Sequence, residues 1–244
     1  MARFDGKTIL ITGGSGGIGR ATAERLASEG ASLILTGTSE DKLADVAKAT
    51  GAKTLVNDAG DPQAAHALAD AVEGQLDGLY LNAGYGAFSP HDQVDAETFD
   101  RQYAVNVRGP ALQMAALSPK LKDGGAVLVT GSIVSEMGMQ AASLYGGSKG
   151  AMRTWVKVLA AELAPRGIRV NAVAPGPIGS DFFARTGIPE EDVKAMGEQI
   201  KGMVPLGRFG EPSEIAAVAA FLLSDEASYV TAATWDVDGG MAGA

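Results

Sequence analysis

Residues 8–19 read Thr-Ile-Leu-Ile-Thr-Gly-Gly-Ser-Gly-Gly-Ile-Gly. An apolar run at 8–11 leads directly into a glycine-rich turn, and a helical pattern follows until Gly30. This order is typical of the place where an α/β protein holds a pyrophosphate, because glycines let the backbone approach the phosphates and the helix start presents free N–H groups. The spacing from Thr12 to Gly19 is T-G-x-x-x-G-I-G, which differs from the usual dinucleotide pattern G-x-G-x-x-G. The stretch therefore predicts an α/β fold with a dinucleotide site after its first strand.

The composition is that of a soluble globular protein. The chain has 244 residues, 46% apolar and 20% charged, so we expect one domain over residues 1–244. A net charge of −9 argues against nucleic acid and anionic membranes as partners. The chain has no cysteine for disulfides or thiol catalysis, and its two histidines lack partners at metal-ligand spacing, so we expect no metal site. No signal peptide is recognised, and the longest apolar run, 215–223, is too short to cross a bilayer, so we expect a cytoplasmic protein.

Short apolar runs alternate with helical patterns along the chain. Apolar runs without polar alternation are typical of parallel strands buried on both faces, so the pattern predicts a doubly wound parallel sheet of about seven strands. The expected strands are 8–11, 32–36, 53–56, 78–82, 126–130, 169–173 and 234–237. The expected helices are 17–29, 40–49, 62–74, 95–117, 145–164 and 211–223. Residues 181–204 look like an inserted substrate loop, with the start of a helix at Glu190. Pro110 is expected to kink the helix at 95–117.

Glycines and polar residues follow the ends of several expected strands. Ligands of parallel sheets bind beyond the carboxyl ends of the strands, so the chemistry of this chain is expected there. These segments are 12–19, 57–59, 82–84, 130–132 and 174–178.

Tyr145 and Lys149 are spaced to lie on one face of the expected helix at 145–164. A phenol normally titrates near pH ~10, so it acts as an acid or base at neutral pH only if its phenolate is stabilised. An ammonium within ~4–6 Å and a cationic nicotinamide both do this. The same spacing also describes an ordinary amphipathic helix. Ser132, however, stands at a strand end and can donate a hydrogen bond to a carbonyl oxygen, and Asn106 lies in the long helix beside the same cleft.

These motifs together resemble the short-chain dehydrogenase/reductase family. They occur in order over essentially the whole chain, and the resemblance implies a single-domain Rossmann fold. Two departures are Leu81, where the family often has Asn, and Ser180, where Thr is common. The motifs are Thr12-Gly13-x-x-x-Gly17-Ile18-Gly19, Asn82-Ala83-Gly84, Asn106, Ser132, Tyr145-x-x-x-Lys149, Pro175-Gly176-x-Ile178-x-Ser180 and Asp238-Gly239-Gly240.

The resemblance also implies roles for the catalytic residues. Tyr145 would donate the proton in reduction and accept it in oxidation. Lys149 would lower the pKa of Tyr145 and hold the nicotinamide ribose. Ser132 would polarise the substrate carbonyl, and Asn106 would hold a water in the proton path. The expected cofactor-binding residues are Gly13, Ser15, Gly17, Ile18, Gly19, Thr38, Ser39, Asp58, Ala59, Asn82, Ala83, Gly84, Tyr145, Lys149, Pro175, Gly176, Ile178 and Ser180.

The end of the second expected strand favours NADP(H) over NAD(H). An acidic residue at this position binds the ribose 2′-hydroxyl of NAD, and Gly37 stands where NAD-specific relatives carry Asp. The usual arginine for a 2′-phosphate is absent as well, since Thr38 occupies its place. Thr38, Ser39 and the next helix start could still hold a 2′-phosphate, against which Glu40 and Asp41 act. NAD(H) therefore stays the alternative.

The expected substrate is a neutral, fairly hydrophobic ketone or secondary alcohol. The residues expected at the mouth are apolar, and we expect no cation there to pair with a carboxylate. They are Tyr85, Phe88, Met137, Met139, Phe182, Phe183 and Met196. A 3-oxoacyl-thioester reductase is an alternative, disfavoured because an acidic carrier protein would meet a chain of charge −9.

Two further alternatives remain open. A catalytically silent cofactor-binding sensor or scaffold would have little use for the four catalytic residues together. A nucleotide-sugar epimerase or dehydratase would need a larger C-terminal domain than residues 181–204 can form.

Apolar residues on more than one face of two long helices predict a homotetramer. One face covers the sheet, and the remaining apolar surface needs a partner. Two self-complementary patches generate two two-fold axes and hence a D₂ tetramer. The helix residues are Leu112, Met114, Ala115, Leu117, Met152, Trp155, Val156 and Leu159, and the second patch holds Trp235, Val237 and Met241.

Overall fold

The computed structural model describes residues 2–179 and 190–243. Its centre is one seven-stranded sheet in the order β3-β2-β1-β4-β5-β6-β7, with every neighbouring pair parallel. The prediction of a doubly wound parallel sheet is confirmed. The strands are β1 (Thr8–Ile11), β2 (Ser32–Gly37), β3 (Lys53–Val56), β4 (Leu76–Leu81), β5 (Leu121–Thr130), β6 (Arg169–Pro175) and β7 (Thr234–Val237).

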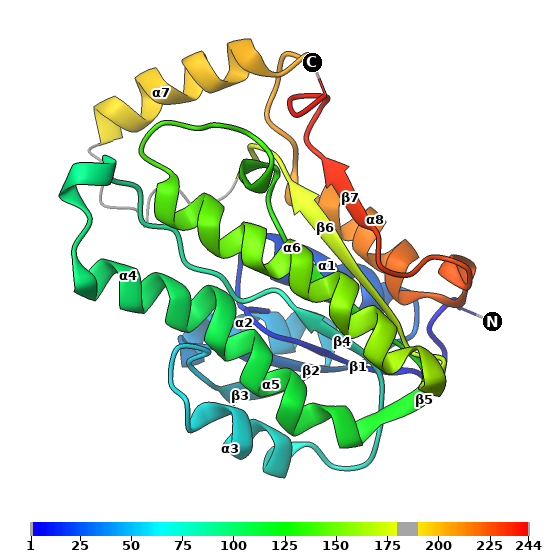
Figure 1. Ribbon diagram of the computed structural model, residues 1–244. Helices are drawn as coiled ribbons and strands as arrows, with labels where there is room; N and C mark the ends of the chain where they lie inside the picture. Colours follow the sequence, from blue (N-terminus) through cyan, green and yellow to red (C-terminus); the bar gives the residue numbers. More distant parts are fainter. Residues whose placement is uncertain (1, 180–189, 244) are drawn as a thin grey trace.

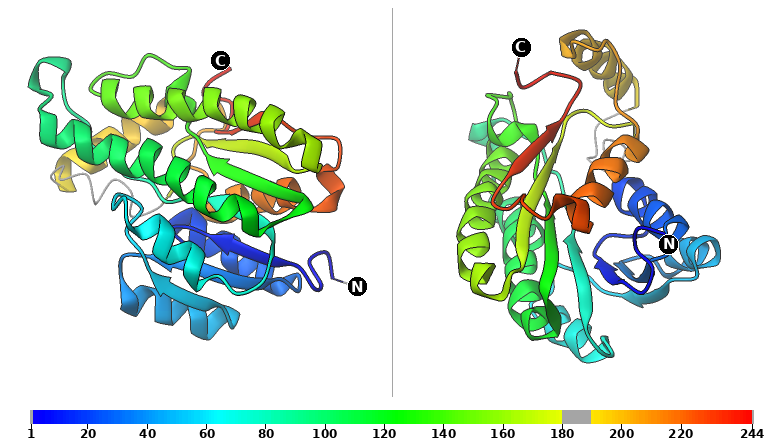
Figure 2. Two further views of the ribbon diagram at one scale, coloured as in Figure 1. Left: turned by 60° about the horizontal axis from the view of Figure 1, so that its bottom comes forward. Right: turned by 90° about the vertical axis from the view of Figure 1, so that its right-hand side faces the viewer.

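Helices cover both faces of the sheet (Figures 1 and 2). In the right-hand view of Figure 2, α4, α5 and α6 lie on one side of the strands, and α1 and α8 lie on the other. The helices are α1 (Gly17–Ser28), α2 (Glu40–Thr50), α3 (Ala64–Ala71), α4 (Ala96–Tyr103), α5 (Gly109–Leu117), α6 (Ser143–Leu163), α7 (Glu190–Met203) and α8 (Pro212–Leu223). None of the helices within the described ranges is both long enough and apolar enough to cross a lipid bilayer.

Successive residues of β1 point into two separate cores. Ile9 and Ile11 of β1 belong to a cluster with Leu26 of α1 and Ile215 of α8. Leu10, between them, belongs to a second cluster with residues of α3, α5 and α6. This alternation follows from the period of two along a strand and explains why the run at 8–11 is apolar throughout.

The order of the strands reverses direction on either side of β1. The chain leaves β1 toward β2 and β3, then returns to β4 on the other side of β1. In such sheets the ligand crevice lies outside the carboxyl ends of the strands at this switch point. The glycine-rich turn after β1 and the Asn82-Ala83-Gly84 segment after β4 are therefore neighbours there.

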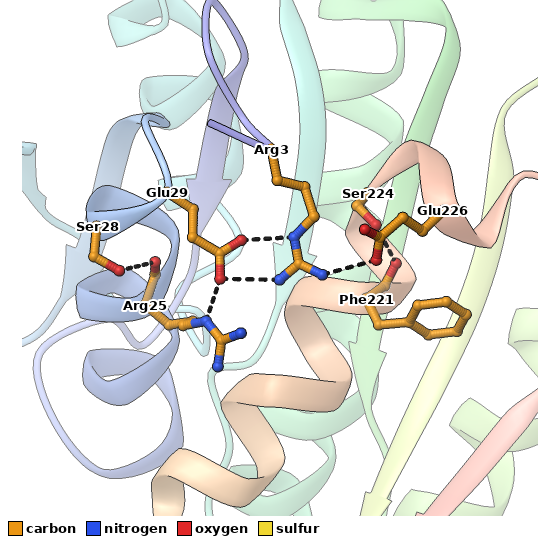
Figure 3. Close-up of polar contacts among 7 residues, drawn as sticks. All are labelled: Arg3, Arg25, Ser28, Glu29, Phe221, Ser224 and Glu226. Atoms are coloured by element: carbon orange, nitrogen blue, oxygen red, sulfur yellow. Dashed lines mark hydrogen bonds and ion pairs between the residues drawn. The ribbon is translucent and has the colours of Figure 1, made fainter. Parts of the chain in front are cut away.

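Arg3, near the N-terminus, binds two glutamates from distant parts of the chain (Figure 3). Its guanidinium donates to Glu29, after α1, at 2.6 and 3.0 Å, and to Glu226, after α8, at 3.0 Å. Arg25 also pairs with Glu29. Burial raises the pKa of Glu29, but the hydrogen bonds from Arg3 and Arg25 outweigh it and lower the pKa below its ordinary value.

The variant Glu29→Gln is expected to lower the free energy of unfolding by about 1–3 kcal/mol at neutral pH, since charge-assisted hydrogen bonds to two guanidinium groups are weakened. The folded state lowers the pKa of Glu29, so this contribution is complete above the ordinary pKa of 4.5 and is lost as pH falls through the folded value. Urea unfolding of both proteins should show the difference at neutral pH and its disappearance in acid. Glu73→Gln, at an exposed ion pair with Lys53, is the control and should change little. Equal losses in the two variants would contradict this role of Glu29.

Candidate active site

The glycine-rich turn after β1 has the geometry that its sequence predicts. Gly13 and Gly17 adopt positive φ angles of 66° and 51°, which non-glycine residues rarely adopt. No side chain caps the start of α1, so its first backbone N–H groups stay available to an anion. A Cβ at Gly19 would lie 2.2 Å from the Gly13 oxygen, so only glycine lets the helix start approach the turn this closely.

Asn82 and Thr12 hold this turn against the segment after β4. The Asn82 side-chain amide donates to the backbone oxygens of Thr12 and Gly13 at 3.1 and 3.2 Å. The Thr12 hydroxyl accepts from the backbone N–H groups of Asn82 and Ala83 at 3.0 and 3.1 Å. Two of the sequence motifs, separated by some seventy residues, thus form one hydrogen-bonded unit.

A cleft of about 420 Å³ runs along the carboxyl ends of the strands. It is continuous from the end of β2 to the loop after β6, and α6 forms part of its wall. Most of the sequence-predicted site residues line it. These are Gly13, Ser15, Gly17, Ile18, Thr38, Asp58, Ala59, Asn82, Ala83, Gly84, Ser132, Tyr145, Lys149, Pro175, Gly176 and Ile178.

Four predicted residues are not in this lining. Gly19 lies behind the turn and packs against Gly13. The Ser39 hydroxyl accepts from Lys42 N–H and so caps α2. Asn106 is buried in the wall behind the cleft. Ser180 lies outside the described residues.

Ser132, Tyr145 and Lys149 meet in the cleft and are buried. The Lys149 ammonium nitrogen donates to the Thr130 oxygen at 2.9 Å and lies 5.8 Å from the centre of the Tyr145 ring. Ser132 forms a side-chain hydrogen bond with Tyr145. The Tyr145 phenol, the Ser132 hydroxyl and the Lys149 cation thus share one small space at the end of β5.

Burial dominates the electrostatics of this group. It raises the pKa of Tyr145 to about 12, against the opposing effect of the hydrogen bond with Ser132. Burial also lowers the pKa of Lys149 to about 8. Burial outweighs the hydrogen bond with Ser132, so the phenol is protonated at neutral pH, which is the form that donates a proton.

Asn106 lies in a π-helix, Ala104–Arg108, between α4 and α5. Pro110 follows at the first turn of α5 and has no N–H to continue an α-helical ladder through this segment. The Asn106 side chain donates to the Tyr85 oxygen and to the Ser148 hydroxyl, and it accepts from the Tyr85 N–H. The helix expected at 95–117 is thus interrupted by this π-helical segment, which places Asn106 between the loop after β4 and α6.

Two cations in the lining were not predicted from the sequence. Lys42 of α2 lines the cleft beside Thr38 and Gly37, whereas Glu40 and Asp41 do not. Arg101 of α4 lines it beside Asp58, with which it pairs at 3.2 Å, and its guanidinium lies 5.9 Å from the centre of the Tyr85 ring. Arg101 is thus a cation in the lining that was not expected from the sequence, and its charge is paired with Asp58. Arg101 and Asp58 lie far apart in the sequence and on different elements of the fold, so no local sequence pattern indicated that they would meet.

The apolar part of the lining partly matches the prediction. Tyr85, Phe88 and Met139 are present, and Met137 is absent. Ile200 of α7 and Met241 were not predicted there, so Met241 belongs to the cleft rather than to an outer patch alone. Phe182 and Phe183 lie outside the described residues, as does the side chain of Met196.

The chain matches known proteins over nearly its whole length. The family model described as enoyl-(acyl carrier protein) reductase matches residues 13–242. An uncharacterised oxidoreductase of Methylorubrum extorquens is 36% identical over 99% of this chain and 100% of its own length. The cyclic-di-GMP-binding biofilm dispersal mediator protein of Escherichia coli is 34% identical over 98% of each chain.

Solved structures agree with these matches. The crystal structure of levodione reductase aligns with a TM-score of 0.92 and 37% identity over 99% of this chain and 100% of that chain. A blue fluorescent protein from a metagenomic library, solved in complex with NADPH, aligns with a TM-score of 0.89 and 31% identity over 98% and 99% of the two chains. By family model, relatives and fold together, the chain belongs to the short-chain dehydrogenase/reductase family of oxidoreductases.

Proposed function

We propose that this protein reduces a neutral, fairly hydrophobic ketone to a secondary alcohol, and catalyses the reverse oxidation, with NADPH as its preferred hydride donor. The observation that carries the proposal is the meeting of Ser132, Tyr145 and Lys149 in the same cleft as the glycine-rich turn. The geometry of that turn fits a dinucleotide, because positive-φ glycines and an uncapped helix start are what a pyrophosphate requires.

The proposed mechanism assigns one task to each side chain. The Ser132 and Tyr145 hydroxyls donate hydrogen bonds to the ketone oxygen, and Tyr145 transfers its proton as the oxygen gains negative charge. The bound nicotinamide supplies the hydride and, once oxidised, a positive charge. Lys149 stabilises the phenolate that remains on Tyr145. The raised pKa of Tyr145 is consistent with a phenol that donates its proton only when the ketone oxygen has become basic.

The apolar lining supports a neutral substrate. Tyr85, Phe88, Met139, Ile200 and Met241 contribute apolar surface to the cleft that holds Tyr145. The charge of Arg101 is already paired with Asp58. A panel of neutral ketones, 2-keto acids and 3-oxoacyl thioesters, tested with NADPH and NADH, should give the highest kcat/KM with neutral ketones.

Other outcomes of the panel separate the alternatives. Preference for keto acids contradicts the proposed pocket, and preference for thioesters identifies a 3-oxoacyl-thioester reductase. Tight NADPH binding without turnover of any compound would favour a sensor, a possibility that the cyclic-di-GMP-binding relative keeps relevant.

Lys42 supports the proposed preference for NADPH. Lys42 lines the cleft at the end of β2, and it forms no ion pair with any residue in the described part of the chain. The two acids that precede it, Glu40 and Asp41, are exposed and do not line the cleft. A 2′-phosphate beside Thr38 would thus meet a positive charge rather than a negative one, and the relative solved with NADPH is consistent with this.

The variant Lys42→Gln is expected to weaken NADPH binding about tenfold and to change NADH binding less than about twofold, because only NADPH carries the phosphate. Fluorescence titration of both cofactors measures the two dissociation constants. Lys48→Gln is the matched control, since Lys48 lies on the same helix, is exposed and pairs with Asp45. Wild-type protein that binds NADH tenfold more tightly than NADPH would contradict the preference.

We also propose that the protein assembles as a homotetramer. Several helix residues expected at the contact turn out to be core residues and cannot form it, namely Met114, Leu117, Met152, Val156 and Leu159. The outward apolar surface of α6 instead includes Val158, which is 51% exposed. A second surface holds Tyr229, fully exposed, and Trp235, whose ring packs against Phe221.

Light scattering should give a mass four times the chain's 24.8 kDa, and Val158→Glu should reduce it to a dimer by placing charges in one two-fold contact. Val56→Glu is the matched control, because Val56 is similarly exposed but lies on the edge strand β3, away from both proposed contacts. Its mass should stay that of the wild type. A stable, active monomer at micromolar concentration would contradict the assembly.

A further inference from the structure

The segment after β4 shapes the cleft beside the catalytic tyrosine. Residues 82–90 contain no helix or strand, yet they carry Tyr85 and Phe88 into the lining. The Phe88 ring lies 5.3 Å from the Tyr145 ring, centre to centre, at an angle of 47°. The position of this irregular segment therefore decides how much room is left beside Tyr145.

Two buried amide side chains hold this segment. Asn106 binds both backbone groups of Tyr85, each at 2.8 Å. Gln102, four residues earlier on the same helical stretch, accepts the Ala87 N–H through Oε1 at 2.8 Å. Ser89 adds a third attachment by donating its N–H to the Ala141 oxygen at 2.9 Å. Gln102 holds Ala87, which is the residue directly before Phe88.

A glutamine at position 102 lowers the stability of the fold, which suggests that its side chain is kept for the hydrogen bond to Ala87. Its side chain is fully buried, and its Nε2 has no hydrogen-bond partner among the described residues. A buried, unpartnered donor lowers stability, so an apolar side chain of the same length would suit the site better. What an apolar side chain would lack is the acceptor for Ala87.

We propose that Gln102 is a positioning residue for ketone binding, which fixes Ala87 and thereby the place of Phe88 beside Tyr145. It touches neither substrate nor cofactor. Its loss lets residues 86–88 shift, which loosens the fit of the ketone while Ser132, Tyr145 and Lys149 keep their places. The kinetic part of this inference rests on the proposed function, and the structural part does not.

Residue-resolved hydrogen exchange tests the structural part with Gln102→Met, which keeps the length of the side chain and removes the acceptor. The Ala87 amide should exchange about tenfold faster or more, because its hydrogen bond is lost. The Tyr85 amide, held by Asn106, should keep its protection. Gln102→Glu retains an acceptor oxygen and should keep the Ala87 amide protected.

Steady-state kinetics test the functional part. In Gln102→Met the KM for the ketone should rise about tenfold, kcat should change less than about threefold, and the dissociation constant of NADPH should stay unchanged. Gln113→Met is the matched control for the ketone KM, because Gln113 of α5 is also a buried amide with an unpartnered atom but bonds to Asn57 at 3.4 Å, away from residues 86–88. Since Asn57 lines the cleft beside Asp58, the NADPH affinity of this variant is not used as a control. Its ketone KM should not change.

Two results would overturn the inference. One is an Ala87 amide as protected in Gln102→Met as in the wild type. The other is an equal rise of ketone KM in Gln102→Met and Gln113→Met, which would indicate a general effect of core substitution. If no ketone is turned over by the wild-type protein, the proposed function fails, and the exchange experiment still decides the role of Gln102.

Discussion

Tyr145→Phe is expected to lower kcat for ketone reduction by about 100- to 10,000-fold, the range typical of a lost general acid. Only the acidic proton is removed, since the ring still packs against Phe88. The dissociation constant of NADPH should therefore stay within about twofold of the wild type. Stopped-flow or steady-state consumption of NADPH measures the first quantity, and fluorescence titration measures the second.

Ser132→Ala separates proton transfer from orientation of the carbonyl. It leaves the phenol of Tyr145 in place but removes the hydroxyl that hydrogen-bonds to it. We expect a smaller loss of kcat than in Tyr145→Phe. Activity of Tyr145→Phe within about tenfold of the wild type, equivalent to ~1.4 kcal/mol in the barrier, would contradict the role of Tyr145 as the proton donor.

Gly19→Ala is expected to weaken cofactor binding about 100-fold or more. The added Cβ would lie 2.2 Å from the Gly13 oxygen and 2.6 Å from the Asn82 side-chain nitrogen, so the turn and the start of α1 must move apart. Alanine is a better helix former than glycine by about 1 kcal/mol, so the loss cannot come from helix propensity. Calorimetric titration with NADPH measures the effect.

Gly16→Ala is the matched control within the same turn. Its backbone is extended, with φ of −170°, and a Cβ there meets no atom within 4 Å. Because Gly16 itself lines the cleft, the NADPH affinity of Gly16→Ala should fall, but by much less than that of Gly19→Ala. Affinity of Gly19→Ala within about threefold of the wild type would contradict the close approach of α1 to the turn.

The strands of the sheet could be predicted because a short apolar run marks each of them in the sequence. The strands expected at 8–11, 53–56 and 234–237 have the observed bounds. The starts of β4 and β5 were missed because they pair with each other beyond an irregularity in register between Leu76 and Gly78, a feature set by the neighbouring strand. The helix expected at 62–74 is shorter, since the backbone is already extended at Val72.

Longer helices depended more on tertiary structure. The helix expected at 95–117 contains the π-helical segment that carries Asn106. Pro110 predicted a kink in this helix but not a π-helix. Within the expected substrate loop at 181–204, the predicted helix start at Glu190 is confirmed and opens α7. The substrate-facing part of that prediction lies largely outside the described residues.

The site was predictable where motifs follow strand ends, because parallel strands bring those ends to one edge of the sheet. Residues that reach the cleft or its wall from a helix face were not predictable, since no local pattern marks them. Lys42, Arg101 and Gln102 are of this kind, and each is recognised only when its neighbours from other elements are known. Ser39 was predicted at the site but does not line the cleft. Its hydroxyl accepts a hydrogen bond from a free backbone N–H at the start of α2, a role that the same sequence pattern predicts equally well.

Transfer of deuterium tests the central claim, hydride transfer between a nicotinamide and a ketone under the control of Tyr145, most directly. NADPH that carries deuterium at both hydrogens of the ring carbon that donates the hydride is incubated with the best neutral ketone of the panel, and the alcohol is examined by mass spectrometry and NMR. We expect one deuterium on the carbinol carbon for each NADPH consumed by the wild type, and almost no labelled alcohol with Tyr145→Phe. Alcohol without deuterium, or equal labelling by the two proteins, would contradict the claim.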